Sequence, residues 1–231
     1  MPILFFGDLE RYKHAGLRVI TVGLNPSHLE FPENNPFERF RQMEGLEQGP
    51  SNYGPYIRSL SRYFEGQRYN WFDNYEDVLS GLKVSYRQNN DADIALHTDI
   101  CSPLATRKPW RRLDRDTKMK LKKGGRPLWE DLMGYLRPQL ILAQVGYHEH
   151  LKKLGAKQNW QGILVPKNIV GTKTEIRLLE RKFNGQLAQI VYWKPIRPTF
   201  GKPFADLSPE QRKSVGKFIR REICPRISGM H

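Results

Sequence analysis

The sequence RVITVGLNPS, residues Arg18–Ser27, is the most specific feature of the chain. Its first five residues are rich in β-branched side chains, a composition that favours a buried β-strand. Gly23 follows this run, and Asn25-Pro26 is typical of a tight turn. We therefore expect a strand over Arg18–Val22 and a turn that projects the side chain of Asn25 into a cleft. A plain β-turn with no further role is the alternative for this pattern taken alone.

Four more segments predict strands. Ile94–Ile100 (IALHTDI) is one, and Leu140–Val145 (LILAQV) is apolar on both faces, as central parallel strands are. Thr174–Lys182 and Gln186–Trp193 flank Asn184-Gly185, a dipeptide that favours a type I′ hairpin turn.

Helices are predicted between and after these strands. Tyr56–Phe64 and Pro127–Leu136 have apolar residues at helical spacing, and a short helix is expected around Phe37–Met43. Near the C-terminus, Ser208 and Gln211 form a capping-box pattern before an amphipathic helix. Strands that alternate with helices predict a three-layer α/β/α sandwich with a central, mainly parallel sheet, in one domain over residues 1–231. Ligands of such folds bind at the carboxyl ends of the strands.

Composition limits the partner and the compartment. The 231 residues contain 38 Lys and Arg against 24 Asp and Glu, a net charge of +14 that suits a polyanion such as nucleic acid. Two cysteines, Cys101 and Cys224, are too few for a disulfide framework, and the apolar runs fall far short of the ~20 residues that span a bilayer. No signal-peptide pattern is present. We expect a cytoplasmic protein, nucleoid-associated in a bacterium, that does not enter a membrane.

The positive charge is concentrated in residues 107–126. This segment has two acidic residues and a net charge of +8, and its ten basic residues are Arg107, Lys108, Arg111, Arg112, Arg115, Lys118, Lys120, Lys122, Lys123 and Arg126. Because it follows the expected second strand, we predict a mobile basic loop that binds phosphates without reading sequence. Trp110 within it is expected to stack on an exposed base. A solvated charged loop is the alternative.

Gly23-Leu24-Asn25-Pro26 after a hydrophobic strand resembles the first motif of the uracil-DNA glycosylase superfamily, and is most similar to its mismatch-specific and single-strand-selective branches. The resemblance implies a uracil-DNA glycosylase-like fold. It also implies that Asn25 positions the water that attacks the sugar carbon. Backbone N–H groups around Gly23 and Leu24 would donate to the departing base.

The same resemblance implies an aromatic residue, about a dozen positions further on, that stacks on the flipped base. Phe37 stands at that distance. Phe31 and Phe40 are rivals for this role, and packing in the core is the alternative for each of them.

The sequence departs from the superfamily where its second motif, often His-Pro-Ser-Pro, should follow the last strand. Residues 193–199 read Trp-Lys-Pro-Ile-Arg-Pro-Thr there, without a histidine. Lys194 or Arg197 would take its place, either stabilising the departing base anion or holding a phosphate. Both interpretations remain open.

A second departure concerns the base. Several members have an asparagine at the end of the second strand that reads uracil, whereas Asp99 stands there in this chain. A carboxylate only accepts hydrogen bonds, so it would be repelled by uracil O4 and would suit the exocyclic amine of cytosine. We therefore expect a modified cytosine, such as glucosylated hydroxymethylcytosine in phage DNA. The alternative is that Asp99 only caps the next loop or pairs with an arginine.

These patterns predict a monofunctional DNA glycosylase, active in phage defence and using no cofactor or metal. Its partner would be duplex or single-stranded DNA, bound by a monomer without an obligate protein partner. The alternatives are a uracil or mismatch repair glycosylase, a non-catalytic nucleic-acid-binding protein of the same fold, and a lyase that uses Lys194. Cys101 beside His97 is expected to be a buried small residue, and His148 and His150 are not expected to bind zinc.

Overall fold

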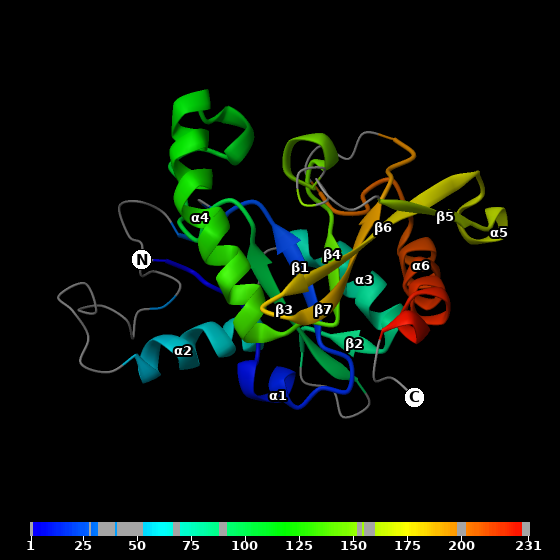
Figure 1. The fold of residues 1–231 in the computed structure, drawn as a ribbon, viewed down its shortest axis with the longest axis horizontal. Helices are drawn as coiled ribbons and strands as arrows, with labels where there is room; N and C mark the ends of the chain where they lie inside the picture. The colour runs from blue at the N-terminus through cyan, green and yellow to red at the C-terminus, as the bar shows by residue number, and fades with distance from the viewer. Residues whose placement is uncertain are drawn as a thin grey trace.

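The computed structural model describes residues 2–27, 29–31, 40, 53–66, 70–87, 92–151, 154, 160–197 and 202–227. Within these residues, seven strands form one sheet in the order β2-β3-β1-β4-β7-β6-β5 (Figure 1). The strands are β1 (Val19–Gly23), β2 (Val84–Ser85), β3 (Asp93–Asp99), β4 (Leu140–Ala143), β5 (Gln161–Val165), β6 (Thr174–Phe183) and β7 (Gln186–Trp193).

The central strand β1 is fully buried and pairs in parallel with β3 on one side and β4 on the other. Strand β4 in turn pairs in parallel with β7, and β3 with β2. In the β1–β3 register Gly23 lies opposite Asp99, and in the β1–β4 register Val22 lies opposite Ala143. The predicted central parallel sheet is therefore confirmed, since these five strands run in one direction.

The other two strands run antiparallel to their neighbours. Strand β6 pairs with β7 as a hairpin, and β5 pairs with β6. Asn184 and Gly185, between β6 and β7, have φ angles of 46° and 81°. Positive φ at both central residues is the requirement of a type I′ turn, so the predicted hairpin is confirmed.

Helices accompany the sheet on two faces. They are α1 (Leu9–Lys13), α2 (Gly54–Ser61), α3 (Asp73–Leu82), α4 (Arg115–Leu136), α5 (Lys167–Val170) and α6 (Pro209–Glu222). Short 3₁₀ turns are η3 (Tyr63–Glu65), η4 (Asn70–Phe72), η5 (Trp110–Arg112) and η8 (Cys224–Arg226), and η6 (Tyr147–Leu151) is a π-helical turn. None of the described helices has both the length and the apolar composition needed to cross a bilayer.

Strand β3 shows that α3 and α4 lie on opposite faces of the sheet. Trp129 of α4 donates its indole N–H to Thr98 Oγ1 at 3.0 Å. The next-door residue His97, which points to the other face, contacts Trp71 and Tyr75 from η4 and α3. This arrangement, with α6 packed on α3, is consistent with a three-layer α/β/α sandwich (Figure 1).

The packing of α6 on α3 depends on two glycines at the helix crossing. A Cβ atom on Gly216 would lie 2.0 Å from the Val78 carbonyl oxygen, and one on Gly81 would lie 2.1 Å from the Lys213 carbonyl oxygen. Helix α6 begins as predicted, because Ser208 and Gln211 form the full capping box.

The prediction of a basic loop over residues 107–126 was wrong for most of its length. Helix α4 begins at Arg115 and continues through Pro127, where the sequence predicted that a helix would start. Asp114 caps it by accepting hydrogen bonds from the backbone N–H and the hydroxyl of Thr117, at 2.8 and 2.7 Å. The predicted short helix around Phe37–Met43 lies, apart from Phe40, outside the described residues.

Candidate active site

The ends of β1, β3, β4 and β7 meet at one edge of the sheet, here called the carboxyl edge, because these strands are parallel. The loop after β3 is fastened to the end of β1. Backbone N–H groups of Ile100 and Cys101 donate to the carbonyl oxygens of Gly23 and Leu24, each at 3.0 Å. The structure therefore places Asn25 just after β1 and Asp99 at the end of the neighbouring strand β3, both at the carboxyl edge.

The side chain of Asn25 is held by two hydrogen bonds. Its Nδ2 donates to the Pro26 carbonyl oxygen at 3.2 Å and to Thr106 Oγ1 at 3.1 Å. The Thr106 hydroxyl in turn donates to the Lys108 carbonyl oxygen at 2.8 Å. Both hydrogens of the Asn25 amide are therefore directed at protein acceptors, which leaves Oδ1 as the atom of the carboxamide suited to accept from water.

Asp99 lies against Gly23 and is almost completely buried, with 3% of its side chain exposed. A Cβ atom on Gly23 would lie 2.4 Å from Asp99 Oδ1 and 3.0 Å from His97 Nε2. The glycine of the strand-end motif therefore makes room for a carboxylate and an imidazole, beyond allowing the turn. His97 Nε2 is 3.8 Å from Asp99 Oδ1, so the ionisable partner of Asp99 in the described chain is a histidine and not an arginine.

His97 is held in turn by a polar chain and by aromatic rings. Its Nδ1 is hydrogen-bonded to Thr21 Oγ1 at 2.8 Å, and Thr21 is hydrogen-bonded to the Tyr86 hydroxyl. The rings of Phe6 and Phe72 pack against the imidazole at centroid distances of 6.0 and 4.9 Å. The sequence did not single out this network, although the alternation along IALHTDI could have placed His97 and Asp99 on the same face.

Tyr75 is a second residue that the sequence did not single out. Its buried hydroxyl lies 3.0 Å from the Val22 carbonyl oxygen and 3.2 Å from that of Leu142, and it accepts from the Gln144 backbone N–H at 3.0 Å. Burial raises the pKa of Tyr75 well above its ordinary value, so the hydroxyl stays protonated and can donate. It therefore ties the ends of β1 and β4 together directly behind the Asn25 turn.

Lys194 follows β7 and is engaged away from Asn25. Its Nζ lies 3.2 Å from Glu175 Oε1 on β6, and this hydrogen bond is the main reason why the pKa of the Glu175 carboxyl is lowered. Because β4 separates β7 from β1, Lys194 stands about two strand spacings, or ~10 Å, from the end of β1. Arg197 is exposed on the same segment.

Asp206 holds the segment that follows the end of β7. One carboxylate oxygen, Oδ2, accepts from the Ile196 backbone N–H at 2.7 Å and from the Trp193 indole N–H at 3.1 Å. The loop that bears Lys194 and Arg197 is therefore fixed at its base by a buried tryptophan.

Of the three phenylalanines considered for stacking on a flipped base, the structure describes two. Phe37 lies outside the described residues. Phe31 and Phe40 are both buried, with their ring centroids 5.6 Å apart, and Phe31 also stacks on Phe6. These two therefore belong to the core, which was the alternative considered for them.

Residues 107–126 form what we call the basic arm, made of η5 and the first half of α4. Figure 1 shows α4 extending beyond the sheet. The exposed basic residues of the arm are Arg107, Lys108, Arg111, Arg112, Arg115, Lys120 and Lys123. In the chain, the basic arm follows directly on Thr106.

The expectation that Trp110 stacks on an exposed base is corrected by its burial. Only 8% of the residue is exposed, Lys122 Nζ lies 5.8 Å from its ring centroid, and the His150 ring packs against it at 6.4 Å. The indole faces the protein interior, so in this arrangement its ring serves to anchor the basic arm.

Cys101 is paired with His150 instead of His97. Its Sγ lies 3.3 Å from His150 Nδ1, and His150 Nε2 lies 3.4 Å from Glu149 Oε2. Burial raises the pKa of Cys101 to about 12 and lowers the pKa of His150 to about 4. At neutral pH the thiol is protonated and therefore a poor nucleophile, which supports the prediction of a buried small residue.

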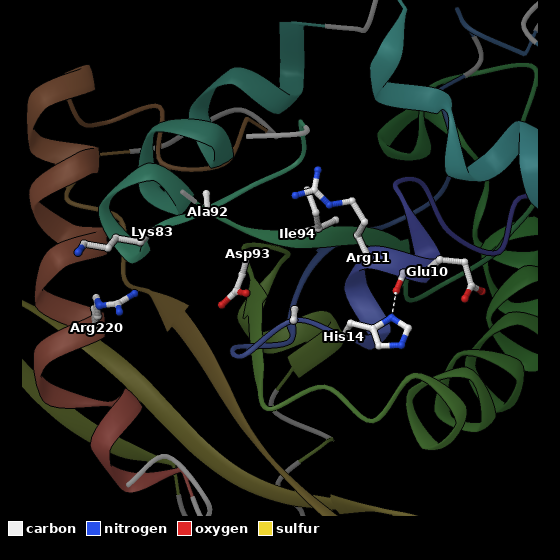
Figure 2. A pocket seen from close by; sticks show the side chains of 9 residues that line it. Glu10, Arg11, His14, Lys83, Ala92, Asp93, Ile94 and Arg220 are labelled. Carbon is white, nitrogen blue, oxygen red and sulfur yellow. Dashed lines mark hydrogen bonds between the residues drawn. The ribbon is translucent and has the colours of Figure 1, made fainter. Parts of the chain in front are cut away.

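Figure 2 shows a cavity of about 600 Å³ at the opposite, amino edge of the sheet. It is lined by α1, the start of β3, Lys83 and Arg220. The Asp93 carboxylate in its wall accepts hydrogen bonds from the backbone N–H groups of Gly16 and Leu17, at 3.0 and 2.8 Å. This cavity is separate from the carboxyl edge. The described residues contain no cluster of three His, Cys, Asp or Glu side chains placed to hold a metal ion.

No protein-family model matches the chain, and neither a curated protein nor a solved structure does. The features that bear on function are therefore the Gly23–Pro26 motif and the geometry of the carboxyl edge.

Proposed function

We propose that this protein is a monofunctional DNA glycosylase, which flips a base out of DNA and hydrolyses its N-glycosidic bond to leave an abasic site. The observation that carries the proposal is that Asp99 ends β3 directly opposite Gly23 of the parallel strand β1, two residues before Asn25. The order of parallel strands around β1 also supports a uracil-DNA glycosylase-like fold.

In the proposed reaction, the role of Asn25 is to position the attacking water. An amide does not accept a proton near neutral pH, so Asn25 would orient the water through Oδ1 and would not act as a general base. Positive charge develops on the sugar and negative charge on the departing base. Backbone N–H groups near Gly23 and Leu24 would stabilise that base, and preorganised donors of this kind are worth ~3 kcal/mol each in other enzymes.

Asp99 favours a cytosine-type base. Buried beside Gly23, its carboxylate would accept from the exocyclic amine of cytosine and repel O4 of uracil. Excision of ordinary cytosine would destroy the genome of the host. A modified cytosine, such as glucosylated hydroxymethylcytosine in phage DNA, resolves this conflict and suggests a role in defence.

The basic arm would supply the affinity for DNA. Its exposed Arg and Lys side chains, Arg107, Lys108, Arg111 and Arg112 among them, would bind phosphates, while Arg197 and Lys194 lie at the end of β7. Phosphate contacts position a protein on DNA without choosing a sequence, so base choice would rest with Asp99.

The test is a panel of labelled duplex and single-stranded DNAs that contain uracil, mismatched thymine, hydroxymethylcytosine or glucosylated hydroxymethylcytosine. Alkali cleavage reveals abasic sites, and Asn25→Ala is measured beside the wild type. We expect cleavage confined to a modified cytosine and abolished by the variant. Cleavage at uracil would instead favour the repair enzyme and refute the argument from Asp99.

A specific observation favours a second candidate, a non-catalytic nucleic-acid-binding protein. Lys194, the cation expected near the departing base, is paired with Glu175 on the far side of β7. If none of the DNAs yields abasic sites while salt-sensitive binding persists, this candidate replaces the enzyme. A borohydride-trapped covalent adduct that is lost in Lys194→Ala would point to a lyase.

A further inference from the structure

We propose that Thr106 is a positioning residue that fixes the orientation of the Asn25 carboxamide and couples it to the basic arm. The inference rests on the proposed function, in which Asn25 Oδ1 holds the attacking water.

The two acceptors around Asn25 determine which way its amide faces. The Pro26 carbonyl oxygen can only accept, so the group 3.2 Å from it must be the Asn25 nitrogen. Thr106 Oγ1 could either donate or accept, but its hydrogen is directed at the Lys108 carbonyl oxygen, 2.8 Å away. It therefore accepts the second Asn25 hydrogen, at 3.1 Å.

A hydroxyl is the required group at position 106. It accepts a hydrogen bond from Asn25 and donates one to the backbone carbonyl of Lys108 in the basic arm, and a methyl group can do neither. Without it, the Asn25 amide keeps only the Pro26 contact and can turn to present a donor where the water needs an acceptor.

The contact also joins two parts of the proposed function. Asn25 and Thr106 are 81 residues apart in the chain, and Lys108 is an exposed residue at the start of the basic arm. Contact of the arm with phosphate would hold the backbone that accepts from Thr106. This would in turn hold the carboxamide in its working orientation.

Single-turnover cleavage tests the inference. The substrate is the DNA of the panel that the wild type cleaves fastest, and DNA affinity is measured separately by fluorescence anisotropy. We expect Thr106→Val to lower the single-turnover rate constant about 100-fold with little change in Kd, because misplacing a reacting group costs rate more than binding. Thr106→Ser should restore most of the rate.

Thr172→Val is the matched control, since it removes the hydroxyl of a half-buried threonine just after α5, outside the basic arm and away from Asn25. It should cleave at the wild-type rate. A Thr106→Val enzyme as fast as the wild type, or a Thr106→Ser enzyme as slow as Thr106→Val, would overturn the inference while leaving the glycosylase proposal intact.

A measurement without catalysis keeps the inference testable even if no DNA is cleaved. The Asn25 side-chain amide signals in a ¹⁵N NMR spectrum, assigned by their loss in Asn25→Ala, should exchange slowly with water in the wild type. They should exchange rapidly in Thr106→Val and remain slow in Thr172→Val. Equal exchange in all three proteins would refute the positioning role.

Discussion

At the scale of single residues, Gly23 is the position where the turn motif and the buried polar network meet. Its missing side chain leaves space that Asp99 Oδ1 and His97 Nε2 occupy. Both groups belong to a closely packed region, with the aromatic rings of Phe6 and Phe72 behind the imidazole. Neither neighbour can therefore move far without disturbing the core.

Gly23→Ala should destabilise the protein by about 2 kcal/mol, the usual order for an added methyl group in a full site. It should also abolish base release, because Asp99 would be displaced. Urea denaturation and the DNA panel measure the two effects. Unchanged stability together with unchanged cleavage would contradict the packing of Asp99 on Gly23.

Asp99→Asn tests whether residue 99 determines which base is excised. An amide can donate to O4 of uracil and accept from its N3–H, whereas the carboxylate can only accept. We expect the variant to lose cleavage of modified cytosine and to gain cleavage of uracil. A variant with the wild-type preference would show that another residue reads the base.

His150 should make stability depend on pH. Its pKa is lowered by burial from 6.5 to about 4, so between these values the unfolded chain binds a proton that the native protein does not. The free energy of unfolding should therefore fall as pH drops from 6.5 towards 4, by at most ~3 kcal/mol from this residue. Glu149, whose pKa is lowered chiefly by its hydrogen bond from Lys122, adds a loss at still lower pH.

The measurement is denaturant unfolding from pH 7 to pH 4 for the wild type and for His150→Asn, which keeps a polar atom near Cys101 Sγ. The variant should show a flatter pH profile between 6.5 and 4. Parallel profiles would mean that His150 titrates normally in the native protein.

At the scale of elements, α4 contains two adjacent glycines, of which only one has room for a side chain. A Cβ atom on Gly125 would lie 2.2 Å from the Cys101 carbonyl oxygen, whereas nothing lies within 4 Å of one on Gly124. Gly125 therefore lets the helix approach the loop after β3, whereas a side chain at position 124 would have room.

Gly125→Ala should destabilise the protein by roughly 2 kcal/mol or more, because the carbonyl oxygen it meets is backbone. Gly124→Ala should stabilise it by up to ~1 kcal/mol, the difference in helix propensity. Thermal unfolding of the two variants measures this contrast. Similar effects in both would argue that α4 does not pack on the Cys101 loop as described.

Elements with local determinants were predictable from the sequence. The Asn184-Gly185 hairpin and the Ser208 capping box depend on residues within a few positions of one another, and both were confirmed. The first half of α4 was missed because it projects from the sheet with few buried residues, so it has no clear apolar periodicity. Contacts such as Asn25–Thr106 were beyond prediction, because they join residues 81 positions apart without any motif.

At the scale of the whole molecule, the charge lies mostly on one arm, and this distribution can be tested. Lys120→Gln combined with Lys123→Gln should weaken DNA binding on every sequence. It should also reduce the slope of log K against log salt by about 2 for duplex DNA, since each phosphate contact contributes roughly 0.9. Lys167→Gln with Lys173→Gln, exposed residues in and just after α5, is the charge-matched control. Figure 1 shows α5 across the molecule from α4. Equal losses of DNA affinity in the two double variants would mean that DNA binding depends on the total charge and not on the basic arm.

The position of β1 between β3 and β4 also has a consequence for how the chain acquires its structure. Arg18, next to β1, is hydrogen-bonded to Gln139, next to β4, across 121 residues of sequence. The central strand therefore cannot gain its second neighbour until most of the polypeptide has been made. Sheets built from such distant pairings form slowly, on the order of milliseconds to seconds, and β1 is exposed to wrong partners until they close. A chaperone acting during synthesis would have its greatest effect on this hydrophobic strand, before Leu140 leaves the ribosome.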